Sequence, residues 1–80
     1  MSDKDYEVAQ AFDYSGLKCP LPVLKARRAL KELATGAVIS IIADDPAAPL
    51  DFTHFCETTG HELLSSTQTD KGTCFIIKKG

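Results

Sequence analysis

The sequence predicts an α/β (α+β) two-layer sandwich, with two helices on one face of a four-stranded mixed sheet. A chain of 80 residues has room for one domain. Its hydrophobic patterns follow the order β-α-β-α-β-β, and glycine or proline marks most of the boundaries between them. We place the single domain at residues 8–80 and expect the polar residues 1–7 to form a flexible N-terminal tail.

The first strand is predicted at residues 8–14, with Val8, Phe12 and Tyr14 on one face and Gln10 interrupting the alternation. Gly16 then marks a turn. A helix of three to four turns follows, because apolar residues recur at helical spacing: Val23, Ala26, Leu30, Leu33 and Ala34. Gly36 stands where a helix C-cap glycine belongs.

Residues 38–43 form a continuous, β-branched apolar run that is typical of a buried strand. Asp45 is a candidate N-cap for the second helix, with Pro46 at its first position and Gly60 at its end. One face of this helix is expected to carry Phe52, Phe55, Cys56 and Thr59. Residues 62–69 and 73–78 then predict two strands joined as a hairpin through the turn at 70–72.

Composition argues against several classes of protein. The net charge is −2 with acidic and basic residues interspersed, so direct nucleic-acid binding is not expected. Neither a signal peptide nor an apolar run of membrane-spanning length is present, which predicts a cytoplasmic location and no membrane contact. The three cysteines are therefore interpreted as reduced thiols rather than as a disulfide framework.

The most informative motif is Gly16-Leu17-Lys18-Cys19-Pro20-Leu21-Pro22, between the first strand and the first helix. A cysteine at a helix start lies in the positive field of the helix dipole, and Lys18 adds a nearby cation, so thiolate is favoured. If Cys19 is the N-cap, Pro22 occupies N3 and has no N–H to donate to the sulfur. We therefore expect a moderately activated nucleophile. The residues alone equally allow a buried cysteine followed by prolines that start a helix.

The chain resembles the TusA/SirA-type sulfur-carrier family, whose signature the Cys-Pro-x-Pro segment matches. Further similar segments occur in the right order: Ala43-Asp44-Asp45-Pro46-Ala47, Asp51-Phe52, Phe55-Cys56, Gly60-His61-Glu62-Leu63 and Phe75-Ile76-Ile77-Lys78-Lys79-Gly80. The resemblance implies the sheet order 1-2-4-3 and a persulfide carried on Cys19. The residues themselves predict that Gly16, Lys18, Pro20 and Pro22 position this side chain.

The resemblance also implies partners. The donor would be a cysteine desulfurase, and the acceptor a protein serving tRNA wobble-uridine thiolation, sulfur oxidation or cofactor synthesis. Exchange at sulfur needs no metal, nucleotide or other cofactor. A carrier that must expose its sulfur is expected to work as a monomer. Some members have an acidic residue between the two prolines, where this chain has the apolar Leu21.

The basic residues Lys25, Arg28 and Lys31 form a stripe on the outer side of the first helix. Two interpretations remain open: a solvated helix face, or, together with Leu21, a docking surface for an acidic partner. Asp44 and Asp45, by contrast, are expected to make only a turn and a helix cap.

Other reactive side chains have simpler interpretations. Cys56 and Cys74 are expected to pack in the structure rather than to react. His54 is expected to be exposed and His61 to pair locally; neither has the spacing from Cys56 that a metal site requires. Two alternatives to a sulfur carrier stay open: a regulatory or binding module of the same fold, and a thiol redox protein.

Overall fold

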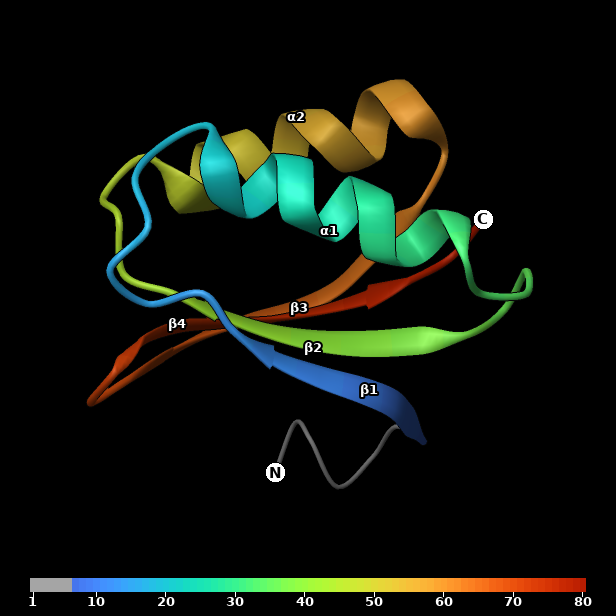
Figure 1. Cartoon of the computed structure of the whole chain (residues 1–80), viewed down its shortest axis with the longest axis horizontal. Helices are drawn as coiled ribbons and strands as arrows, with labels where there is room; N and C mark the ends of the chain where they lie inside the picture. Colours follow the sequence, from blue (N-terminus) through green and yellow to red (C-terminus); the bar gives the residue numbers. More distant parts are fainter. Residues whose placement is uncertain (1–6) are drawn as a thin grey trace.

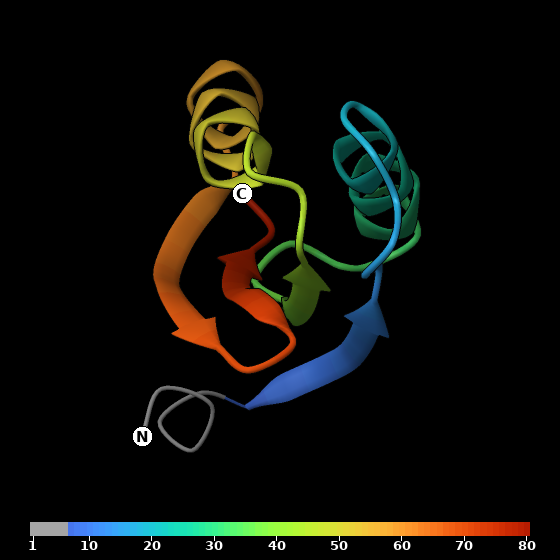
Figure 2. The same cartoon turned by 90° about the vertical axis from the view of Figure 1, so that its left-hand side faces the viewer.

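The computed structural model describes residues 7–80, and the predicted tail at residues 1–7 lies, apart from Glu7, outside the described residues. The elements follow the predicted order, with bounds β1 Val8–Asp13, α1 Leu21–Lys31, β2 Val38–Ala43, α2 Ala48–Thr59, β3 Glu62–Thr69 and β4 Gly72–Lys78. The sheet has the order β1-β2-β4-β3; β1 and β2 are parallel and the other pairs antiparallel. Both helices cover the same face of the sheet (Figures 1 and 2).

The core lies between the sheet and the two helices. Alternate residues of the two central strands point into it, which is why β2 and β4 are rich in branched and aromatic side chains. It consists of Ile39, Ile41 and Ala43 from β2, Phe75 and Ile77 from β4, Ala26 and Leu30 from α1, and Ala48, Phe52, Phe55 and Cys56 from α2. The predicted inner faces of both helices are confirmed except at Ala34, which lies beyond the end of α1, and Thr59, the last residue of α2; both are exposed.

The first strand departs from the predicted alternation. A register shift between Val8 and Gln10 adds one residue to β1 relative to β2. Beyond it, Gln10 lines the same groove as Phe12 and Tyr14 instead of interrupting their face. Tyr14 lies just beyond β1, although its N–H still donates to a β2 carbonyl at 2.8 Å.

The ends of the first helix differ from the prediction. It begins at Leu21 and its C-cap is Glu32, so Gly36 is not the C-cap. Gly36 instead has φ +94° in the following loop, and its N–H donates to the Lys79 carbonyl at 2.9 Å. Gly36 does have the left-handed conformation that a C-cap glycine adopts, but the helix ends before it.

The second helix begins two residues later than predicted, at Ala48, with Ala47 as an N-cap that forms no side-chain bond. Asp45 is not the N-cap, because its Oδ1 accepts the Ala47 N–H at 2.9 Å and makes a turn before the helix. At the other end, Gly60 has φ +85° and donates its N–H to Cys56, as a C-cap glycine does. The predicted end of this helix is therefore confirmed.

Candidate functional site

Cys19 lies in the loop that joins β1 to α1, and its side chain is exposed. The loop closes in a turn in which the Leu21 N–H donates to the Lys18 carbonyl at 2.8 Å, and the Cys19–Pro20 peptide bond is cis. Pro20 is the N-cap residue of α1. Cys19 therefore precedes the helix and is not its N-cap, so Pro22 does not occupy N3.

Two acids directly after β2 hold this loop by its backbone. The Gly16 N–H donates to both carboxylate oxygens of Asp44, at 3.0 and 3.1 Å. The Cys19 N–H donates to Oδ2 of Asp45 at 2.7 Å. These acids were expected to make only a local turn and a cap, so sequence reasoning missed their part in the site.

A signal that could have found them lies in the topology. Because β1 and β2 are parallel neighbours, their carboxyl ends meet at one edge of the sheet. The loop after β1 carries Cys19, and the loop after β2 carries Asp44 and Asp45 (Figure 1, left-hand end). Parallel pairing of the two strands therefore predicts that the two loops lie next to each other.

The electrostatic environment of Cys19 is acidic rather than basic. A side-chain hydrogen bond to Asp51 raises the pKa of the Cys19 thiol, and partial desolvation and the charges of Asp51 and Asp45 act in the same direction. Lys18 acts instead on Asp45, whose pKa is lowered mainly by backbone hydrogen bonds from Ala47 and Cys19 and to a smaller extent by this ammonium group. The pKa of the Cys19 thiol is thus raised rather than lowered, opposite to the direction expected from a helix dipole and Lys18.

The other motif residues shape the loop. Gly16 has φ +86°, a left-handed conformation that suits glycine. Pro22 is buried in the first turn of α1, and Pro20 lines a groove between the two helices. The motif thus presents one exposed sulfur on a backbone fixed at both ends.

Large apolar side chains stand exposed around this end of the helix layer. Leu21 and Leu24 of α1 are 45% and 48% exposed, and Leu50 of α2 is 75% exposed. Between the helices lies a groove of about 510 Å³ that is more apolar than its neighbours. Its lining includes Pro20, Val23, Arg27, Leu50, Asp51, His54, Phe55, Thr58 and Thr59.

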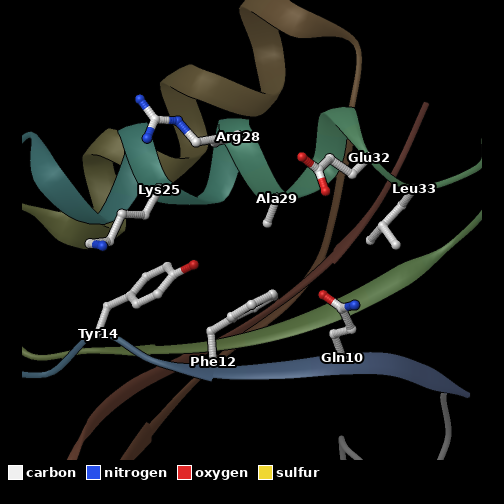
Figure 3. Close-up of a pocket in the computed structure, with 8 residues that line it drawn as sticks. All are labelled: Gln10, Phe12, Tyr14, Lys25, Arg28, Ala29, Glu32 and Leu33. Carbon is white, nitrogen blue, oxygen red and sulfur yellow. The ribbon is translucent and has the colours of Figure 1, made fainter.

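The predicted docking residues follow one another along α1: Leu21, Lys25 and Arg28 line one small pocket, and Arg28 and Lys31 line another. Lys25 and Arg28 line a second groove, of about 390 Å³, between α1 and β1. Figure 3 shows the Lys25 side chain directed towards Tyr14 and the Arg28 side chain directed away from the rings of Tyr14 and Phe12, which stack with centroids 5.5 Å apart. Leu21 lies beside the cysteine, whereas Lys31 lies ten residues along the helix, roughly 15 Å away at 1.5 Å per residue.

The remaining reactive residues have structural surroundings. Cys56 packs in the core as predicted, and burial raises its pKa to about 11. Cys74 is also buried, in β4. His54 is exposed, and Nδ1 of His61 accepts the Gly80 N–H at 3.1 Å.

Within residues 7–80, no three side chains among His, Cys, Asp and Glu gather as a metal site would require. Over the same part of the chain, no helix has the length and apolar character to cross a membrane.

Comparison with known proteins gives one consistent result. The family described as sulfurtransferase TusA matches residues 10–79. The sulfur carrier protein TusA of Allochromatium vinosum is 42% identical over 79 residues, covering 99% of each chain. A relative from Neisseria meningitidis serogroup A is 45% identical over 62 residues, which is 78% of this chain and 84% of the relative.

The fold has a solved counterpart as well. The crystal structure of a SirA-like protein from Desulfitobacterium hafniense superimposes with a TM-score of 0.73 at 26% identity, covering 86% of this chain and 93% of that one. The structural match and the sequence matches therefore indicate the same family. The chain belongs to the TusA family, and it is a TusA-type sulfur carrier.

Proposed function

We propose that Cys19 accepts sulfane sulfur from a cysteine desulfurase as a persulfide and passes it to an acceptor protein. The observation that carries this proposal is the exposed Cys19 side chain, on a loop held by Asp44 and Asp45. A thiol that visits two partners in turn must be reachable and held in one place. The other two cysteines are buried, so neither offers such a position.

The transfer is an exchange at sulfur and needs no external oxidant. The Cys19 thiolate attacks the outer sulfur of the donor persulfide, and the S–S bond of the donor breaks. The donor leaves as a thiolate with the electron pair, and Cys19 becomes the persulfide. An acceptor thiolate then attacks the outer sulfur of the Cys19 persulfide. The acceptor becomes the persulfide, and Cys19 leaves as a thiolate that is ready for another cycle.

The direct test is loading by a cysteine desulfurase with cysteine and pyridoxal phosphate, followed by intact mass measurement. We expect a gain of one sulfur atom that a reductant removes, and no gain in Cys19→Ser. Cys56→Ser is the matched control and should load like the wild type. The proposal fails if the wild type gains no sulfur, or if Cys19→Ser gains as much.

The stripe on α1 supports a second part of the proposal, docking onto an acidic partner surface. Lys25 and Arg28 are exposed, and both line a small pocket with Leu21 and Leu24 at the cysteine end of the helix. The double reversal of Lys25 and Arg28 to Glu should slow sulfur loading in a salt-dependent way. Unchanged loading kinetics at low salt would show that the donor does not use this stripe.

A further inference from the structure

The groove of about 390 Å³ between α1 and β1 is lined by an incomplete part of the core. Phe12, Tyr14 and Leu33 pack against the core from the groove side, but each of them is only partly buried. Ala29 lies above the groove on α1, and its small side chain leaves the space open (Figure 3). Three large apolar side chains therefore stay partly in contact with water, and a further apolar side chain that entered the groove would cover them.

β1 is the outermost strand, on one side, of the sheet that residues 7–80 form. The direction of its backbone groups follows from Tyr14, whose N–H donates to the Ile42 carbonyl of β2 at 2.8 Å. Because successive residues of a strand direct their N–H groups to opposite sides, the N–H groups of Ala11 and Asp13 point away from the sheet. Both residues are exposed. The groove therefore opens beside backbone groups that are placed to pair with another strand.

The charges differ between the two ends of the groove. Lys25 is directed towards Tyr14 at one end, and Arg28 lies one turn further along α1. Glu32 lies above Gln10 towards the other end (Figure 3). Two cations and one carboxylate thus line the groove, whereas the whole chain has a net charge of −2. A carboxylate is therefore favoured at the Tyr14 end and disfavoured beside Glu32.

The geometry points to this groove as a docking site for an extended segment of a partner protein, which adds a strand beyond β1. An apolar side chain of the segment lies beside Phe12 and under Ala29, and an Asp or Glu two residues away lies beside Tyr14 and Lys25. Two residues of a strand span about 6.7 Å, and Phe12 and Tyr14 are themselves two residues apart, so one added strand presents both side chains to the groove. The inference rests on the docking part of the proposed function, because Lys25 serves both.

An extended chain fits this groove better than a small molecule does. α1 and β1 are its two walls, and it is open along the outer edge of β1, so much of a small ligand would stay in water. A strand gains backbone hydrogen bonds along β1, and its alternate side chains give specificity in the groove. The register shift between Val8 and Gln10 interrupts β1 near its start, so pairing is expected within residues 10–14.

The first experiment titrates the isotope-labelled protein with synthetic peptides and follows its amide signals by NMR. Two blocked peptides cover both strand directions: Thr-Thr-Thr-Val-Thr-Glu-Thr-Thr-Thr, and the same sequence with Val and Glu exchanged. Threonine supplies a polar residue that favours the extended conformation. We expect at least one of them to shift the signals of residues 10–14 and of the groove residues of α1, and the same peptide with Lys in place of Glu to bind more weakly. Binding by neither peptide, or shifts confined to other residues, would overturn the proposal.

Amide hydrogen exchange of the wild type separates strand addition from simple charge attraction. With the peptide at about ten times its Kd, exchange of the Ala11 and Asp13 N–H groups should slow about tenfold. Ala11→Pro removes one of these donors without removing a bond to β2, and proline is tolerated at such edge positions. This variant should keep its circular dichroism spectrum and bind the peptide more weakly. Peptide binding that leaves both amides in fast exchange would overturn strand addition.

Lys25→Gln tests the charged end of the groove. It should weaken binding of the Glu peptide about twofold to fivefold, as the loss of a surface ion pair does. Lys78→Gln is the matched control, because it removes an exposed cation of β4 that does not line the groove. An equal Kd for the wild type and Lys25→Gln would overturn the placement of the acidic side chain. Peptide binding involves no sulfur, so a wild type that never loads refutes the proposed function while these titrations still decide the use of the groove.

Discussion

Replacing Phe52 by alanine tests how much the core beneath α2 contributes to the stability of the fold. Phe52 is fully buried, and its ring centroid lies 4.7 Å from Phe75 and 6.5 Å from Phe55. Such a truncation costs about 3–5 kcal/mol from lost burial and from the cavity it leaves. A chain of 80 residues has a free energy of unfolding of roughly 4–12 kcal/mol, so the substitution would remove between about a quarter and all of that free energy.

Urea unfolding followed by far-ultraviolet circular dichroism is the suitable assay, because the chain has no tryptophan. With a slope of about 1 kcal/mol per molar urea, Phe52→Ala should lower the midpoint by about 3 M or more. Leu50→Ala is the control: its side chain is 75% exposed, and the change should stay within about 0.5 kcal/mol. A midpoint for Phe52→Ala within 0.5 M of the wild type would refute this account of the core.

Three further predictions concern a glycine, an acid and the buried thiol. Gly72→Ala should destabilise far more than Gly16→Ala in urea unfolding: both have positive φ, but a Cβ at Gly72 would lie 2.7 Å from a β2 carbonyl oxygen, whereas Gly16 has nothing within 4 Å. Equal losses would contradict this geometry. The folded pKa of Asp45 is lowered from 3.8, mainly by backbone hydrogen bonds, so its stabilising contribution is present above that value and lost as pH falls through the folded pKa. The thermal midpoint of Asp45→Asn should therefore fall less between pH 5 and pH 3 than that of the wild type, and parallel curves would argue against the anchor. Iodoacetamide at pH 8 should modify Cys19 in the native protein and Cys56, whose pKa is about 11, only after unfolding. Modification of both at one rate, measured by peptide mass, would contradict the described burial.

Much of the fold followed from local pattern. The apolar run of β2, the helical spacing in α1 and the glycine after α2 each report a periodicity or a conformation that the residues themselves impose. The hairpin of β3 and β4 was predictable for the same reason. The full sheet order was implied by family resemblance, since the local pattern pairs only β3 with β4 and does not place β1 and β2.

The errors arose where a distant residue competes with a local rule. Asp45 is a good N-cap by sequence, yet its carboxylate is shared between Ala47 and Cys19, which lies 26 positions away. The thiol was expected to be activated by its own helix, but Asp51 comes from the other helix and acts in the opposite direction. Both effects depend on the parallel pairing of β1 and β2, which brings two loops together. Local sequence rules do not include such contacts between distant residues, so they could not predict either effect.

The anchoring of the cysteine loop has a consequence for how such carriers diversify. Asp44 and Asp45 grip the peptide N–H groups of Gly16 and Cys19, which every residue except proline possesses. The side chain of Leu21 makes none of these hydrogen bonds and is 45% exposed. If Leu21 contacts partner proteins as proposed, its replacement would change which proteins recognise the carrier without moving the backbone of Cys19, so that partner choice and the position of the thiol could evolve separately.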